Sequence, residues 1–328
     1  MVNYTIIQRL LHRICLSNNF IKKTTFDIES LFFKNKNENF LNKEHVFITG
    51  LSRSGTTALL NAIYYQDTFA SLTYNDMPFV LSPNLWKLIS KNKKNYFYNR
   101  LHGDSIKYSL DSPEAFDEVF WRTFSDSENE DYFSKYIFLI LKRYKKERYL
   151  SKNNNNYKRI NKISSIFPNC LFLITFRDPL QHAFSLLNQH KKFIHLQQKD
   201  RFILSYMNWL GHNEFGLGYV SWNKPIKYLD SLDINHWIEQ WYLFYSNLKD
   251  NYIDYQKSYL VSYEELCGEK KIKNSLSKLL NIKKNINENY FKSSNKNIEM
   301  EYNKDLLNKS NDIYKKLILS DKNIGKKA

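Results

Sequence analysis

The sequence predicts an α/β protein in which a central, mainly parallel sheet is flanked by helices in a three-layer arrangement. Three apolar, strand-like runs support this prediction: VFIT at 46–49, LFLITF at 171–176 and YLVSY at 259–263. Each leads through a short turn, or directly, into a segment with helical patterning. Strands that alternate with helices pair in parallel, and ligands bind at the edge where such strands end. We therefore expect the functional residues just after these runs.

Further helical segments are predicted at 86–98, 114–124, 130–149, 200–214 and 231–250. The chain has no internal repeat and no linker rich in proline or glycine, so no boundary is predicted inside residues 41–281. Residues 1–40 are expected to form a helical appendage, and residues 282–328 a polar tail that contains a helix. The main domain should therefore span residues 41–281.

The N-terminal segment has an apolar stripe at helical spacing, formed by Ile6, Ile7, Leu10, Leu11 and Ile14. It lacks the continuous apolar core of a signal peptide, and no apolar run approaches the ~18 residues of a membrane-spanning helix. We expect this basic segment to dock on the domain, with contact to a membrane surface as the alternative.

The chain of 328 residues carries a net charge of +16, which suits an anionic substrate, a nucleic acid or an acidic membrane. Much of the lysine lies in stretches mixed with asparagine, such as KNKNENF and KNKKN, which are typical of solvated surface. No specific nucleic-acid partner is therefore expected. Cys15, Cys170 and Cys267 lie far apart without a Cys-x-x-Cys pair, so we expect reduced thiols, a cytoplasmic location and no metal site.

The segment GLSRSGTT, residues 50–57, lies between the first strand and its helix. Gly50 and Gly55, with four residues between them, match the outline of a phosphate-binding P-loop. The lysine that should follow the second glycine is replaced by Thr56, and a cation stands inside the loop at Arg53. Because a helix N-terminus presents free N–H groups and a positive dipole end, the loop predicts an anion site. The alternative is a turn whose hydroxyls only cap the helix.

A second anion site is predicted in TFRDPLQHAFSLLNQH, residues 175–190. Arg177 directly follows an apolar strand, Asp178 suits the N-cap, and Pro179 suits the first helical position. Ser185 lies eight residues after the arginine, and a guanidinium with a helix hydroxyl can bind a phosphate. An Arg–Asp pair beside a solvent-facing serine is the alternative. Together the two segments predict a ligand with two separated phosphates.

These motifs resemble those of the sulfotransferases that use 3′-phosphoadenosine 5′-phosphosulfate (PAPS). GLSRSGTT is similar to their 5′-phosphosulfate loop, RDP with its distant serine to their 3′-phosphate site, and VSYEEL to a stretch whose tyrosine lies at the nucleotide. The arginine inside the loop makes this motif most similar to that of the tyrosylprotein and bacterial sulfotransferases. The tyrosylprotein enzymes carry an additional arginine shortly after the serine, whereas this chain has Gln189 near that position. The resemblance implies a P-loop-like fold, PAPS as co-substrate, and transfer to a hydroxyl or amine, with saccharides among the candidate acceptors. It also implies these nucleotide-binding residues: Ser52, Arg53, Ser54, Gly55, Thr56, Thr57, Arg177, Ser185 and Tyr263.

The catalytic base is harder to predict. Asp76, in SLTYNDMPFVLSPNLW, is the first candidate, because the tyrosylprotein enzymes carry a carboxylate in a similar place. The alternative for Asp76 is a cap of the turn before Pro78. His102, Asp104 and Glu114 are the competing bases, and Arg53 is expected to stabilise the leaving phosphate in the transition state.

Two other functions remain open at this point. A P-loop kinase or NTPase would share the glycine loop, but Thr56 occupies the position of its lysine. A non-catalytic protein that binds polyanions would explain the charge alone. The paired anion sites favour the sulfotransferase.

Overall fold

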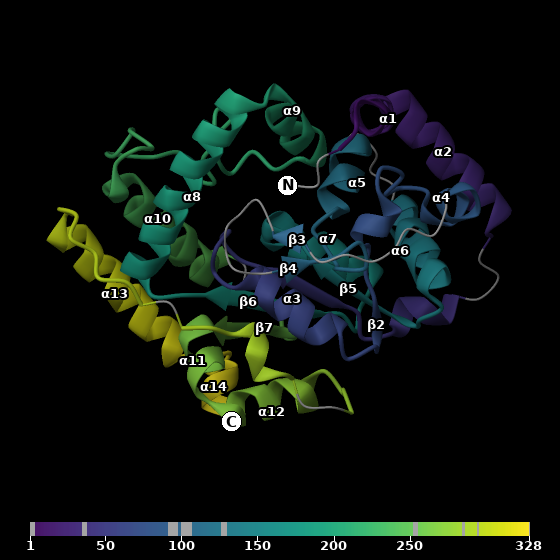
Figure 1. Ribbon diagram of the computed structural model, residues 1–328. Coiled ribbons are helices and arrows are strands. Elements are labelled where there is room, and N and C mark those ends of the chain that lie inside the picture. Colours follow the sequence, from purple (N-terminus) through teal and green to yellow (C-terminus); the bar gives the residue numbers. More distant parts are fainter. Residues whose placement is uncertain are drawn as a thin grey trace.

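The computed structural model describes residues 4–34, 38–90, 98–99, 107–125, 130–251, 255–283, 286–293 and 295–327. Its centre is a sheet of five strands in the order β2-β5-β1-β6-β7, and every pair in it is parallel (Figure 1). The strands are β1 (Val46–Thr49), β2 (Phe69–Ala70), β5 (Arg148–Lys152), β6 (Leu171–Phe176) and β7 (Ser258–Ser262). A separate antiparallel pair is formed by β3 (Tyr98–Asn99) and β4 (Lys107–Tyr108). The predicted α/β class and parallel sheet are confirmed.

Helices cover both faces of this sheet, because successive residues of a strand point to opposite sides. Phe47 and Ile174 belong to one core cluster, while Val46, Ile48 and Leu173 belong to the other. The first cluster includes α6 (Glu130–Tyr144), α7 (Ile160–Ile166), α10 (Ile234–Asn251) and α13 (Lys304–Ile318). The second includes α3 (Thr56–Tyr64), α12 (Lys270–Leu279) and α14 (Ile324–Lys327). The fold therefore has the three layers that the sequence predicts.

The N-terminal segment forms two helices, α1 (Ile6–Ser17) and α2 (Asn19–Phe32), which begin at the caps Thr5 and Asn18. Helix α1 packs on α9 (Arg201–Leu210), and α2 packs on α5 (Asp117–Thr123) and α6. Buried Glu29 of α2 accepts hydrogen bonds from the first turn of α4 (Pro83–Ile89). The segment therefore docks on the domain. No helix in the described ranges is long and apolar enough to cross a membrane.

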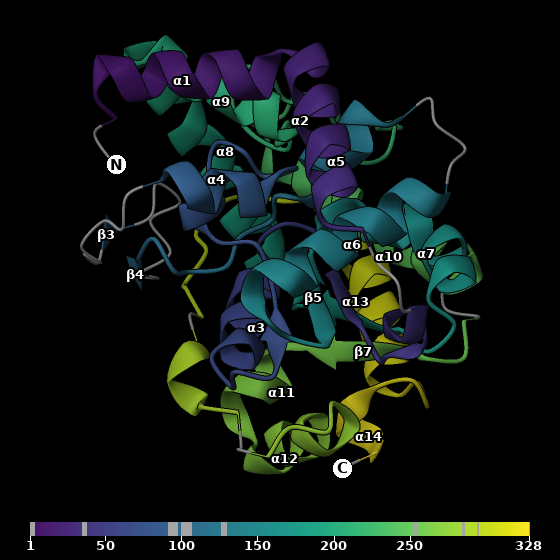
Figure 2. The same cartoon turned by 90° about the vertical axis from the view of Figure 1, so that its right-hand side faces the viewer.

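The C-terminal residues also pack on the body of the protein. After η4 (Glu288–Tyr290), α13 contacts α10 and α8 (Pro179–Lys199). The amide of Leu260 in β7 donates to the carbonyl of Lys322 at 2.9 Å, and α14 follows directly. Figure 2 shows α13 and α14 at the side of the molecule opposite α1. Residues 295–327 are thus an integral part of the fold and contribute a helix to each face of the sheet.

The central strand β5 is the main difference from the predicted elements, because the predicted helix at 130–149 extends into it. Its sequence RYLSK has only two large apolar residues, so local patterning gives a weak strand signal. Pairing between β2 and β1 makes it a strand, with Leu150 opposite Val46. The other elements are η1 (Glu38–Asn42), η2 (Tyr74–Asp76), η3 (Asn154–Arg159) and α11 (Tyr263–Gly268).

Candidate active site

The glycine loop connects β1 to α3 at the carboxyl edge of the sheet. Gly50, Arg53 and Gly55 have φ angles of 137°, 70° and 95°, which side-chain-bearing residues rarely adopt. A Cβ on Gly50 would lie 2.6 Å from the carbonyl oxygen of Thr175, because the loop starts against the end of β6. This backbone leads directly into the N-terminus of α3 at Thr56, which is the geometry of an anion site.

Hydrogen bonds from buried side chains fix the conformation of the glycine loop. Ser54 is fully buried, donates to the carbonyl of Leu51 at 2.7 Å and lies 2.5 Å from the Thr175 hydroxyl, so it supports the loop. His182 of α8 donates from Nε2 to the carbonyl of Ser52 at 2.7 Å. Burial lowers the pKa of His182 to about 3, which keeps the ring neutral. The loop is therefore shaped by the protein itself, and sequence reasoning did not single out His182.

The second predicted anion site adjoins the loop. Arg177 directly follows β6 and is 7% exposed, and Asp178 caps α8 by accepting from the amide of Gln181 at 2.9 Å. Ser185 lies further along α8, where its hydroxyl accepts a hydrogen bond from Nε of Arg53 at 3.2 Å. A residue of the glycine loop thus contacts the predicted 3′-phosphate serine.

Tyr263, the first residue of α11, joins the two segments. A Cβ on Gly55 would come within 2.3 Å of the Tyr263 ring, so ring and loop are in close contact. The guanidinium carbon of Arg177 lies 5.3 Å from the centre of the same ring, a cation–π distance. The tyrosine hydroxyl donates to the carbonyl of Lys292 at 2.9 Å. The ring therefore lies against both predicted anion sites.

Gln189 provides a test of whether this edge suits an anionic group. It lies one turn after Ser185 on α8 and is 4% exposed. Its amide nitrogen is buried and has no hydrogen-bond partner in the part of the chain that the structure describes. Buried donors are rarely left unpaired, so a ligand oxygen is the natural partner. Lys191 and Lys192, which follow Gln189 on α8, are exposed. Within the described residues, no contact indicates that either lysine takes the place of the additional arginine of the tyrosylprotein enzymes.

Asp76 is enclosed in the structure. Its carboxylate is 0% exposed and accepts hydrogen bonds from the amide of Thr73 at 2.8 Å and from the hydroxyl of Tyr144. Arg143 forms an ion pair with it at 3.3 Å. Burial raises the pKa of Asp76. This geometry matches the capping alternative and argues against Asp76 as the base, because the buried carboxylate is already held by other groups of the protein.

Glu114, the competing carboxylate, lies beside the sheet edge. Its Oε2 accepts from the hydroxyl of Tyr74 at 2.8 Å, and its Oε1 lies 3.9 Å from Nζ of Lys152. Lys152 ends β5 and pairs in register with Ile48 of β1, two residues before the glycine loop. Glu114 is therefore linked through Lys152 to the start of that loop. His102 and Asp104, the other competitors, lie outside the described residues.

Two groups after β5 also belong to this edge, although sequence reasoning missed them. The amide nitrogen of Asn154 donates to the Ser52 hydroxyl at 2.5 Å and to the Glu214 carboxylate at 3.2 Å. Lys152, the last residue of β5, is 9% exposed and pairs in register with Ile48 of β1. Only the identification of β5 as a strand could have pointed to them, since ligand-binding residues follow parallel strands.

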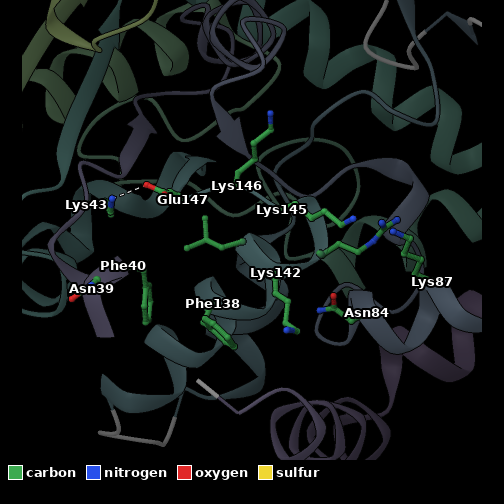
Figure 3. Close-up of a pocket in the computed structure, with 12 residues that line it drawn as sticks. Asn39, Phe40, Lys43, Asn84, Lys87, Phe138, Lys142, Lys145, Lys146 and Glu147 are labelled. Carbon is green, nitrogen blue, oxygen red and sulfur yellow. Dashed lines mark hydrogen bonds and ion pairs between the residues drawn. The ribbon is translucent and has the colours of Figure 1, made fainter. Parts of the chain in front are cut away.

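A hollow of about 640 Å³ lies elsewhere, between α4 and the end of α6 (Figure 3). Its lining is strongly basic, with Lys43, Lys87, Lys142, Arg143, Lys145 and Lys146 against Glu147. Residues 145–147 precede β5, so this hollow is at the opposite end of the strand from Lys152. It is separate from the candidate active site.

Comparisons with known proteins identify the family of the chain. Among curated proteins, none matches the sequence. Two solved mycobacterial sulfotransferases are similar in structure. STF1 from Mycobacterium tuberculosis H37Rv is 13% identical, with 94% of this chain and 81% of that chain covered and a TM-score of 0.43. STF9 from Mycobacterium avium is 12% identical, with 66% and 68% covered and a TM-score of 0.33. A family model described as "Sulfotransferase family" matches residues 45–273, which include both anion-site motifs, and the chain belongs to that family.

Proposed function

We propose that this protein uses PAPS as its donor and transfers the sulfuryl group to a hydroxyl or amine of an acceptor. The observation that carries the proposal is the joining of two anion sites on one sheet edge. Arg53 reaches from the glycine loop to Ser185, and Tyr263 contacts both Gly55 and Arg177. A nucleotide with phosphate groups at its 5′ and 3′ positions matches this pair of sites.

Within this proposal, the backbone N–H groups at the start of α3, with Thr56 and Thr57, bind the 5′-phosphosulfate. Arg177, Ser185 and the unpaired amide of Gln189 bind the 3′-phosphate. Ser52 and Ser54 act through the loop, because the hydroxyl of Ser54 is bonded inside it and that of Ser52 accepts from Asn154.

The transfer forms a bond between the acceptor atom and sulfur, while the bond from sulfur to the bridging oxygen of the 5′-phosphate breaks. The acceptor proton passes to a base, and adenosine 3′,5′-bisphosphate (PAP) leaves. Arg53 and Lys152, two cations at the loop, stabilise the charge that develops on the leaving phosphate. This role explains why the loop needs no lysine after Gly55.

We assign the base to Glu114 in preference to Asp76. Tyr74 donates to one oxygen of Glu114 and Lys152 lies near the other, so the carboxylate is oriented at the sheet edge. Asp76 is instead occupied by Thr73, Tyr144 and Arg143. The proposal needs only a base beside the loop, and replacement of each carboxylate decides between them.

The direct test is calorimetric titration of the purified protein with PAP, followed by an assay of sulfuryl transfer from PAPS to mixed hydroxyl and amine acceptors. PAP should bind more tightly than ATP with magnesium, because ATP has no 3′-phosphate for Arg177. Tighter binding of ATP, with release of inorganic phosphate, would instead support the kinase or NTPase function. Binding of DNA alone, lost at high salt, would support a polyanion-binding protein.

A further inference from the structure

Helix α1 is apolar on two opposite faces. One face packs into the domain with buried His12, Cys15 and Leu16. The other exposes four large aliphatic side chains: Ile6 at 86%, Ile7 at 79%, Leu10 at 55% and Ile14 at 45%. At 3.6 residues per turn, these four fall within an arc of about 100°. An exposed helix face is normally polar, so this stripe calls for a partner.

Neighbouring helices also expose large apolar side chains. Phe20, Leu31 and Phe32 of α2 are 67–76% exposed, as are Leu88 and Ile89 at the end of α4 at 71–76%. Figures 1 and 2 both place α1, α2 and α4 side by side, and Glu29 connects α2 to α4 by hydrogen bonds. We call this set of exposed residues on α1, α2 and α4 the apolar face.

The charges near this face are positive on α1 and at the end of α4 and mixed along α2, where a second hollow has Asp27, Glu38 and Asp131 beside Lys34 and Lys135. Helix α1 contains no acidic residue, and Arg13 and Lys23 are exposed, with Asp27 as an exposed acid on α2. The basic hollow of Figure 3 adjoins this face at α4, which contributes Asn84 and Lys87 to its lining. Lys87 directly precedes Leu88, and Lys142 lies 5.4 Å from the ring of Phe33 at the end of α2.

Part of the positive charge in the hollow is neutralised within the protein. Lys43, Arg143 and Lys146 form ion pairs with Glu147, Asp76 and Asp67. Lys87, Lys142 and Lys145 form no ion pair with any residue in the described ranges, so their charge faces outward. The hollow thus offers three cations to a partner.

We propose that the apolar face, together with the basic hollow beside it, docks on an anionic lipid bilayer. Aliphatic and aromatic side chains on a helix that lies in the interface, flanked by lysine and arginine, suit lipid chains and acidic headgroups together. A second copy of this chain fits less well, because each copy carries a net charge of +16. The docking does not depend on sulfuryl transfer.

The test uses the full chain in co-sedimentation with vesicles of phosphatidylcholine, alone or mixed with phosphatidylserine. The wild type should bind the mixed vesicles, with weaker binding as salt increases. The double variant Ile7→Asp/Leu10→Asp should reduce the vesicle-bound fraction by about tenfold or more. Leu319→Asp is the matched control, because Leu319 is 69% exposed at the end of α13, which packs on α8 and α10, and it should change binding by less than about twofold.

The charge contribution is tested by Lys87→Glu/Lys142→Glu, which should abolish the preference for phosphatidylserine. Lys309→Glu/Lys316→Glu, two exposed positions on α13, makes the same change in net charge and should retain the preference. Unchanged thermal melting confirms that each variant is folded. The proposal is overturned if the wild type binds neither vesicle, or if the α1 variant binds as the wild type does. A wild-type dimer that the α1 variant dissociates, without vesicle binding, would make this face a self-association surface.

Discussion

Arg177→Ala is expected to weaken PAP binding by about tenfold to over a hundredfold. A charge-assisted hydrogen bond to phosphate contributes about 1.5–3 kcal/mol, and each 1.4 kcal/mol corresponds to a factor of ten. The structure places the loss toward the upper end, because Glu264 lies 3.8 Å from the Arg177 guanidinium. Removal of the arginine leaves that carboxylate facing the 3′-phosphate without a cation between them.

Titration calorimetry of PAP and adenosine 5′-monophosphate measures the effect, since only PAP carries the 3′-phosphate. The affinity for the monophosphate should change less than about threefold, because its contacts lie at the glycine loop. Arg177→Lys keeps the charge but loses the planar fork, so its affinity should be intermediate. Arg201→Ala removes an exposed arginine from α9 as the control. Equal losses for the two nucleotides would refute a 3′-phosphate role for Arg177.

Other residues of the candidate site can be tested in the same way. Gly55→Ala should lower the free energy of unfolding, measured in urea, by about 1–3 kcal/mol, because Gly55 has a φ of 95° and an added Cβ would clash with the Tyr263 ring. Gly268→Ala is the control and should leave stability unchanged, because Gly268 has open space around it. Glu114→Gln should slow turnover about 100- to 10,000-fold while PAP affinity stays the same. Asp76→Asn should mainly lower the melting temperature. The reverse result would identify Asp76 as the base. Below pH 6.5 the unfolded chain protonates His182 while the folded chain, with its pKa of about 3, does not, so stability from this group decreases as pH falls. The wild-type melting temperature should therefore drop more steeply from pH 7 to pH 4 than that of His182→Gln, and parallel curves would disprove the neutral, buried ring.

The sequence predicts the parts of the site that have a local signal. Arg177, Asp178 and Pro179 follow a strand of six buried residues, and the predicted cap and helix start are confirmed. The glycine loop is equally local, because its strand and helix adjoin it in the chain. Such motifs can be recognised because strand, turn and helix N-terminus each restrict the residues they accept.

The remaining part of the site depends on tertiary contacts. β5 is a strand because it pairs with β1 and β2 on either side. The local sequence around Lys152 therefore did not indicate that this residue ends a strand. For Asp76, the sequence position matched that of a catalytic carboxylate, but Tyr144 and Arg143 of α6, which is distant in the sequence, enclose its side chain. A carboxylate's accessibility, which decides whether it can take a proton, is fixed by packing that residue spacing does not reveal.

The separation of the two anion sites is set by the sheet. β1 and β6 are neighbours, with Thr49 opposite Ile174, so the glycine loop and Arg177 leave the same edge from adjacent strands. Tyr263 then fills the space between Gly55 and Arg177, and its hydroxyl is anchored to the carbonyl of Lys292. The ring lies against both segments and the Arg53–Ser185 hydrogen bond joins them, so the two predicted sites have a fixed spacing that a ligand must match. ATP, whose phosphates form one chain on the 5′ oxygen, has no 3′-phosphate to contact the guanidinium of Arg177, whereas PAP provides a phosphate for each predicted site. We therefore expect Tyr263→Ala to reduce the preference for PAP over ATP, even though Arg177 and the loop are retained.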